Sequence, residues 1–187
     1  MSEPSATRPL RADAQRNRER LLEVAVRAFS GAGPEVSLEA IAKEAGVGIG
    51  TLYRHFPTRE ALVEATYRNE LARLCDAADE LLETLPPERA LREWMDRFID
   101  YMATKRGMAD ALRAVVASGG NPFEESRTRL RGAIGTLLDA AGIDIDPADV
   151  LASLSGISLT AGAPEQREQA SRLLDLLMNG LRYEESG

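Results

Sequence analysis

The stretch from Ser37 to Phe56, SLEAIAKEAGVGIGTLYRHF, constrains the fold of this chain more than any other part of its sequence. Ser37 is suited to cap a helix, because its hydroxyl can accept a backbone N–H bond, and Ile41 follows at helical spacing. The glycines that come next interrupt this pattern. Leu52 and Phe56 then fall on one face of a second short helix, four residues apart. The stretch therefore predicts a helix, a tight turn and a second helix.

The opposite face of the second helix is polar. It carries hydroxyls, a cation and an imidazole on Thr51, Tyr53, Arg54 and His55, all within two turns. Such a face can read bases and phosphates when its helix enters the major groove of DNA. Periodicity alone equally allows a small helical hairpin whose outer side is only solvated.

The residues of this stretch resemble the DNA-binding signature of the TetR family of bacterial transcriptional regulators. The matching positions are Ile41-Ala42, Ala45-Gly46-Val47, Gly50-Thr51-Leu52-Tyr53, His55-Phe56 and Arg59-Glu60-Ala61-Leu62. Upstream, Leu21-Leu22, Ala25, Phe29 and the turn from Gly31 to Gly33 look like the first helix of that family and its end. The resemblance covers about a third of the chain and implies a DNA-binding helix-turn-helix.

The resemblance also implies a set of DNA-contacting residues, namely Ser37, Gly48, Ile49, Thr51, Tyr53, His55 and Arg59. Thr51 and Tyr53 match positions that face the major groove or its phosphates, and His55 matches a backbone-contacting position. Ser37 and Arg59 match positions near phosphates at the ends of their helices. Gly48 stands where the family commonly has serine, which puts one contact in doubt.

Three further residues of the motif are expected to have structural roles. Leu52 and Phe56 are expected in the core. Gly50 fits either close packing within the protein or close approach to DNA, and we expect the packing role.

The net charge of −7 argues against DNA binding unless the acidic residues lie away from the motif. Residues 1–59 contain nine Lys and Arg against seven Asp and Glu, whereas residues 60–187 contain fourteen against twenty-three. Exposed charges are screened over about 8–10 Å at ordinary salt, so acidic groups on a separate domain weaken DNA binding only slightly. The distribution fits a basic reader joined to an acidic body.

The rest of the chain shows helical periodicity broken by proline and glycine, with no alternating strand pattern. Residues 1–14 are expected to form a flexible arm, which either reaches a minor groove or has no role. Helices are expected at 15–29, 58–85, 88–106, 108–117, 123–141, 147–161 and 164–183. We predict an all-α fold: a DNA-binding three-helix bundle with its arm at 1–57, then a larger helical ligand-binding and dimerisation domain at 58–187.

Catalysis, cofactors and metals find no support in the residues. The chain has one histidine and one cysteine, Cys75, and no phosphate-cradling or nucleophile motif. A single cysteine excludes an internal disulfide, and no apolar run is long enough to span a membrane. These features predict a cytoplasmic protein that is not an enzyme.

The body is expected to bind a small apolar effector and a second copy of the chain. The family implies a pocket among the central helices, with Trp94, Phe98, Tyr101, Met102, Leu112, Val115 and Phe123 as candidate ligand-binding residues. The last two helices are candidates for a homodimer interface, although they could also pack within one chain. The segment from 58 to 85 would be either a rigid connector that transmits a switch or a spacer.

The C-terminal half also resembles the SbtR-like subgroup of the family. The complete prediction is a homodimeric repressor that binds a roughly palindromic operator and is released by an apolar effector. The alternative is an all-helical interaction protein that binds another helix and never contacts DNA.

Overall fold

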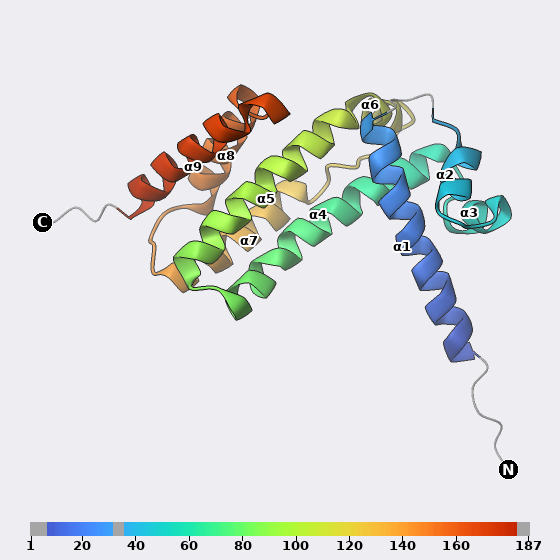
Figure 1. Cartoon of the computed structure of the whole chain (residues 1–187), viewed down its shortest axis with the longest axis horizontal. Coiled ribbons are helices and arrows are strands. Elements are labelled where there is room, and N and C mark those ends of the chain that lie inside the picture. Colours follow the sequence, from blue (N-terminus) through green and yellow to red (C-terminus); the bar gives the residue numbers. More distant parts are fainter. Residues whose placement is uncertain (1–6, 32–35, 183–187) are drawn as a thin grey trace, which may run out of the picture. The chain divides into compact units, whose positions relative to one another are not determined.

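The computed structural model describes residues 7–31 and 36–182, and every regular element within them is a helix (Figure 1). The helices are α1 (Thr7–Gly31), α2 (Leu38–Glu44), α3 (Ile49–His55), α4 (Arg59–Thr84), α5 (Pro87–Gly107), α6 (Ala109–Ala117), α7 (Ser126–Ala141), α8 (Pro147–Thr160), the short 3-10 helix η2 (Pro164–Gln166) and α9 (Arg167–Leu181). The prediction of an all-α fold is confirmed. In the parts of the chain that the structure describes, no helix is both long and apolar enough to cross a membrane.

Contacts between residues divide the chain into two compact units. The first unit combines the residues up to Asn69 with residues 107–122, and the second combines residues 70–106 with those from Phe123 onward. The first unit therefore contains α1, α2, α3, the start of α4 and all of α6. This division differs from the predicted boundary between residues 57 and 58, because α4 continues through the division and α6 returns to the first unit.

In the first unit, α1 packs against both α2 and α3, which also pack against each other (Figure 1). The apolar side chains in the second half of α1 face this core. Its buried side chains, together with those of the motif, are Leu21, Leu22, Ala25, Phe29, Ile41, Leu52 and Phe56. The three-helix bundle of the prediction is present.

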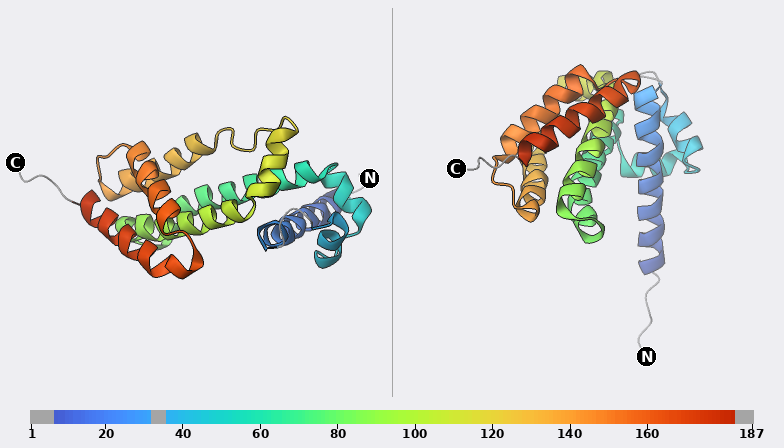
Figure 2. Two further views of the ribbon diagram at one scale, coloured as in Figure 1. Left: turned by 90° about the horizontal axis from the view of Figure 1, so that it is seen from above. Right: turned by 60° about the vertical axis from the view of Figure 1, so that its left-hand side comes forward.

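The second unit is organised around Trp94 on α5. Its ring is fully buried, and its Nε1–H donates to the backbone oxygen of Leu74 on α4 at 2.7 Å. The ring centroid of Phe98, one turn further along α5, lies 5.9 Å away. Helices α7, α8 and α9 complete the unit, with α8 packed against both of the others (Figure 2).

Several helix boundaries differ from the predictions; α9, for example, begins at Arg167, after η2, rather than at 164. Helix α1 begins at Thr7 and so includes much of the predicted flexible arm, because Pro9 falls in the first turn, where its missing N–H is tolerated. Helix α7 begins at Ser126 rather than 123, because Glu125 has a left-handed φ of 63° that a helix cannot continue. Residues 1–6 of the arm, the turn residues after Gly31 and residue 183 lie outside the described residues.

The predicted start of α8 is confirmed. Asp146 caps it, with a side-chain oxygen accepting the Ala148 N–H at 2.8 Å, and Pro147 takes the first helical position.

Replacement of Trp94 by phenylalanine tests the packing of the second unit. Trp94→Phe removes the indole donor and leaves a void in the core, so we expect the free energy of unfolding to fall by about 2–4 kcal/mol. Urea denaturation followed by circular dichroism measures this change. The exposed aromatic Tyr53 supplies the control, and Tyr53→Phe should change the stability by less than about 0.5 kcal/mol. Equal effects of the two substitutions would contradict a central role for Trp94.

Candidate nucleic-acid interface

The turn between α2 and α3 is fixed by backbone hydrogen bonds and one buried side chain. The Gly46 N–H donates to the Lys43 oxygen at 3.1 Å, and the Val47 N–H donates to the Ala42 oxygen at 2.9 Å. Gly46 has a φ of +65°, a conformation that favours glycine. Val47 is buried beneath the turn. These contacts set the angle at which α3 leaves α2.

Helix α3 is divided sharply between a buried and an exposed face. Leu52 is completely buried, while Ile49 and Tyr53 have exposed fractions of 39% and 45%. Exposed apolar and aromatic side chains that share one helix face can form a contact surface. The exposed face of α3 is therefore the candidate reading surface.

Arg54 belongs to this exposed face, although the set of DNA-contacting residues implied by the resemblance omits it. Its Nε–H donates to the Gly50 oxygen at 3.1 Å, and its Nη2 donates to the Thr51 hydroxyl at 3.0 Å. An arginine carries five N–H donors, so further donors are left for phosphates or base edges. The sequence signal for Arg54 was its place on the polar face of the second helix of the motif.

The two glycines at the start of α3 have open surroundings. A Cβ atom added at Gly48 or Gly50 would meet no heavy atom of the described residues within 4 Å. The expected packing role of Gly50 is therefore wrong, because no described residue occupies the space beside it. Close approach of Gly50 to DNA stays a prediction.

Ser37 has the capping role that the sequence predicted. Its hydroxyl accepts the Ala40 N–H at 3.1 Å and so begins α2. His55, at the end of α3, is half-buried, with its ring centroid 6.1 Å from that of Phe56. Phosphate contacts by Ser37 and His55 stay predictions.

Arg59, at the start of α4, is directed into the protein. Its guanidinium lies 4.9 Å from the centroid of the Phe29 ring on α1, and its Nη1 donates to the backbone oxygen of Val36. The side chain is half-buried. This arginine fastens α4 to α1 and to the segment before α2, whereas Arg54 points outward.

Two arginines of α1 contact residues at the ends of α3 and α2. The guanidinium of Arg18 lies 5.7 Å from the centroid of the Phe56 ring, and Arg27 pairs with Glu44 of α2 at 3.1 Å. The first contact is a cation–π interaction and the second an exposed ion pair of small energetic value.

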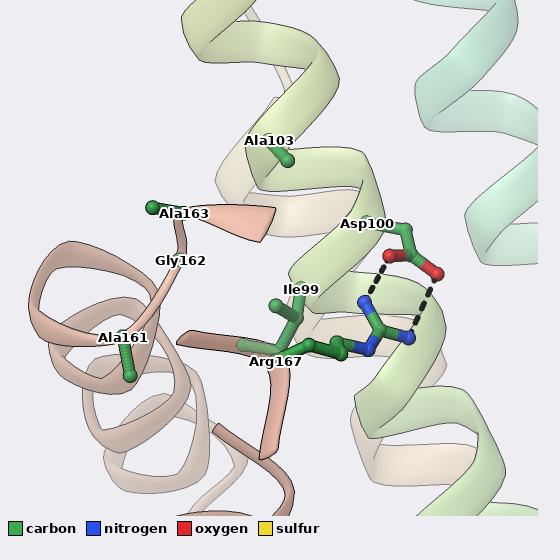
Figure 3. A pocket seen from close by; sticks show the side chains of 7 residues that line it. All are labelled: Ile99, Asp100, Ala103, Ala161, Gly162, Ala163 and Arg167. Carbon is green, nitrogen blue, oxygen red and sulfur yellow. Dashed lines mark hydrogen bonds and ion pairs between the residues drawn. The ribbon is translucent and has the colours of Figure 1, made fainter. Parts of the chain in front are cut away.

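The second unit holds a pocket of about 290 Å³ between α5 and the segment that follows α8 (Figure 3). Ile99 and Ala103 of α5 and Ala161 and Ala163 of that segment give it apolar walls. At one side, the Arg167 guanidinium pairs with the Asp100 carboxylate through two hydrogen bonds, one of them 3.1 Å long. The hydrogen bond that Arg167 donates to the Asp100 carboxylate raises the pKa of Arg167, so this arginine stays charged.

Comparison with known proteins identifies both parts of the chain. Residues 21–66 match the family model of bacterial regulatory proteins of the tetR family, and residues 86–183 match that of the C-terminal domain of SbtR-like transcriptional regulators. The crystal structure of the TetR transcriptional regulator SCO0520 from Streptomyces coelicolor is 58% identical, with a TM-score of 0.84 over 88% of this chain and 98% of that one. The chain belongs to the TetR family of bacterial transcriptional regulators.

Two further relatives agree with this assignment. The TetR transcription regulatory protein from Mycobacterium vanbaalenii is 36% identical, with a TM-score of 0.76 over 94% of this chain and 100% of that chain. An HTH-type transcriptional regulator of Staphylococcus aureus is 43% identical over 63 residues, which are 33% of this chain. The match spans only 34% of the length of that curated relative. The family and these relatives are transcriptional regulators rather than enzymes, and the TetR-type helix-turn-helix of this chain is a DNA-binding element.

The ligand-binding residues predicted for this TetR-family member fall in both units. Leu112 and Val115 lie on α6 in the first unit, whereas Trp94, Phe98, Tyr101, Met102 and Phe123 lie in the second. Trp94, Phe98, Tyr101, Leu112 and Val115 are buried as core, and Phe123 has an exposed fraction of 40%. The 290 Å³ pocket is lined by other residues of α5 and by the segment after α8. A ligand role for the predicted set stays a prediction.

Cys75 lies in the second unit. It is half-buried on α4, and this burial raises the pKa of its thiol.

The opposite orientations of Arg59 and Tyr53 separate folding from DNA contact. We expect Arg59→Ala to lower the free energy of unfolding by about 1–3 kcal/mol, because it removes a cation–π contact and a charged hydrogen bond. Tyr53→Ala should lower it by less than about 0.5 kcal/mol, since the ring is largely exposed. Chemical denaturation of both variants measures the difference. Unchanged stability of Arg59→Ala would contradict the structural role of this arginine.

Proposed function

We propose that this TetR-family regulator is a repressor that binds a roughly palindromic operator as a homodimer and is released by a small apolar effector. The observation that carries the proposal is the face of α3, where Ile49 and Tyr53 are exposed while Leu52 of the same helix is fully buried. A helix held in this way can enter a major groove without rearranging. A dimer bound to a promoter prevents other proteins from binding there, because it covers the same stretch of DNA.

The DNA contacts follow from the position of each side chain. We propose that Thr51, Tyr53 and Arg54 reach base edges and phosphates, and that Gly48 and Gly50 allow the backbone of α3 to approach the duplex. Ser37 and His55 would contact phosphates at the ends of their helices. Phosphate contacts set affinity and register, whereas base contacts set sequence preference.

The homodimer is supported by the most exposed apolar residues. Among the exposed large apolar side chains of the described residues, Leu159 on α8 and Leu176 on α9 have the highest exposed fractions, 78% and 67%. Helices α8 and α9 pack against each other, and a Cβ atom added at Gly156 on α8 would meet no heavy atom of the described residues within 4 Å. These features suit a partner helix that approaches closely.

Dimerisation supplies the selectivity that one reading helix lacks. Each correctly read base pair contributes only about 1–3 kcal/mol, so one short helix discriminates poorly. In a twofold dimer, two copies of α3 enter successive major grooves about 34–36 Å apart or at a related spacing. The operator should then be an inverted repeat.

The 290 Å³ pocket is the proposed effector site. Its volume lies near the lower end of the range for ligand sites, which suits a small compound. Ile99 and the alanines of the lining would hold an apolar body, and the Arg167–Asp100 pair borders the entrance. We propose that this regulator binds its operator in the cytoplasm, because bacterial DNA lies there.

Substitution of Arg54 tests the reading surface. A binding sequence is first selected from a random pool of duplex DNA, and fluorescence anisotropy then measures the affinity for it. We expect Arg54→Ala to weaken binding about tenfold or more, because each lost base or phosphate contact costs roughly 1–3 kcal/mol. Arg127→Ala, at an exposed arginine of α7, is the control and should keep the wild-type affinity. Recovery of no sequence, even at low salt, would overturn the proposed function.

Charged substitutions at the exposed leucines test the dimer. Leu159→Glu and Leu176→Glu place a carboxylate in the proposed apolar interface, so we expect each to shift the protein from dimer to monomer in analytical ultracentrifugation. Val116→Glu, at a half-exposed valine of α6, is the matched control and should remain dimeric. A dimer that survives both leucine substitutions would exclude α8 and α9 as its interface.

A further inference from the structure

The guanidinium of Arg54 is held beside the first turn of α3, although its backbone belongs to the last turn. Its Nε–H donates to the Gly50 oxygen at 3.1 Å, and its Nη2 donates to the Thr51 hydroxyl at 3.0 Å. Helical side chains lean toward the start of their helix, so residues three and four positions earlier are the partners within reach. The charge of Arg54 is thereby brought back along α3 to Gly50 and Thr51.

These two hydrogen bonds order the side chain without neutralising it. Both acceptors are uncharged, and both bonds are exposed to solvent. Exposed contacts between residues three or four positions apart stabilise a helix only weakly. A long side chain that is already ordered, however, loses less conformational freedom when it binds. The hydrogen bonds of Arg54 therefore matter more for binding by α3 than for its stability.

The same bonds determine which donors of Arg54 stay available. The Nε–H and one N–H of Nη2 lie along one edge of the planar guanidinium, and both are used within α3. The other donors are the two N–H groups of Nη1 and the second N–H of Nη2. Two of these are parallel at the end of the group, an arrangement that pairs with two neighbouring acceptors.

Guanine offers two such acceptors, O6 and N7, in the major groove. Adenine instead places the donor N6 beside N7, and each pyrimidine edge carries only one polar group. A phosphate also has paired oxygens, but the first residues of a recognition helix are those that meet base edges. The guanidinium of Arg54 lies beside two of those residues, Gly50 and Thr51.

The glycines of this turn leave the approach to the bases open. A Cβ atom added at Gly48 or Gly50 would meet no heavy atom of the described residues within 4 Å. Neither residue has a side chain that could separate the guanidinium from a base pair.

We propose that Arg54 reads a guanine in each half of the operator, and that Thr51 is the positioning residue that holds Arg54 for this contact. The assignment rests on the proposed DNA-binding function and names the base that one side chain of α3 recognises. Thr51 acts through Arg54, because its hydroxyl accepts one N–H of the guanidinium and leaves the paired donors free.

Paired changes of the base and the arginine test the assignment. The wild-type protein selects operators from a random pool of duplex DNA, and each guanine is then replaced in both halves by 7-deazaguanine, which lacks the N7 acceptor. At one position we expect the wild type to lose affinity about fivefold or more, because one charged hydrogen bond is lost. Arg54→Ala should bind the two duplexes within about twofold of each other. Fluorescence anisotropy measures all four affinities.

The same measurement separates base reading from a phosphate contact. If Arg54 contacts only phosphate, Arg54→Ala weakens every duplex alike and keeps the wild-type response to each 7-deazaguanine. That result would overturn the assignment and leave the proposed function in place. Selection of no sequence by the wild type would remove both.

Thr51→Val tests the positioning role, because it removes the hydroxyl and keeps the shape of the side chain. We expect the response to the critical 7-deazaguanine to fall to about twofold or less, while responses at other guanines stay at the wild-type level. Thr51→Ser keeps a hydroxyl and should restore the response. Thr136→Val is the control, since the exposed Thr136 hydroxyl bonds only its own helix α7, at the Gly132 oxygen. A general loss of affinity in Thr51→Val with a wild-type response would refute the positioning role.

Side-chain order in the free protein supplies a test without DNA. Nuclear magnetic resonance relaxation of each arginine Nε–H measures its order parameter. We expect a higher value for Arg54 than for Arg127, an exposed arginine of α7, and a fall to the Arg127 value in Thr51→Val. Equal values for the two arginines in the wild type would overturn the positioning role, whether or not an operator is found.

Discussion

A helix of seven residues does not hold its shape in water, because the cost of nucleation exceeds what a few hydrogen bonds return. Helix α3 exists because Leu52 and Phe56 are buried against the first unit, with exposed fractions of 0% and 3%. Burial of two such side chains contributes several kcal/mol, about 1.5–3 for each. The same burial directs Tyr53 and Arg54 to the outside. DNA recognition by this protein therefore depends on apolar contacts that never meet DNA.

Arg54 and Arg59 lie close together in the sequence, but the core gives their side chains different positions. Arg54 lies along the outer face of α3, whereas Arg59 lies over the Phe29 ring and bonds the Val36 oxygen. Both carry the same charge near the same surface. Position relative to the apolar core decides which one is exposed and which one stabilises the fold.

Much of the fold followed from the sequence because its signals are local. Helix periodicity, the Ser37 cap, the start of α8 at residue 147 and the glycine turn at Gly46 depend on signals within a few residues and were predicted correctly. The left-handed Glu125 was missed, since no glycine marks it. Gly50 was misinterpreted, because a glycine in open space and a glycine in a crowded one look identical in a sequence.

The parts of the site that escaped prediction depend on contacts between distant residues. The inward direction of Arg59 requires Phe29 and Val36, which are 30 and 23 positions away. The hydrogen bonds from Arg106 to the Ser158 and Gly162 oxygens span more than 50 positions. No spacing rule announces such pairs. The resemblance to the TetR family supplied the fold of the reader, but not which of its charged residues face inward.

By its contacts, helix α6 belongs to the first unit, although α4 and α5 precede it in the chain. A unit assembled from two separate stretches is not a portable cassette. Recombination that joins residues 1–69 of this regulator to the body of a relative would discard α6 and replace it with one from a different first unit. Viable chimeras, whether natural or engineered, should therefore inherit residues 107–122 from the same parent as the N-terminal segment.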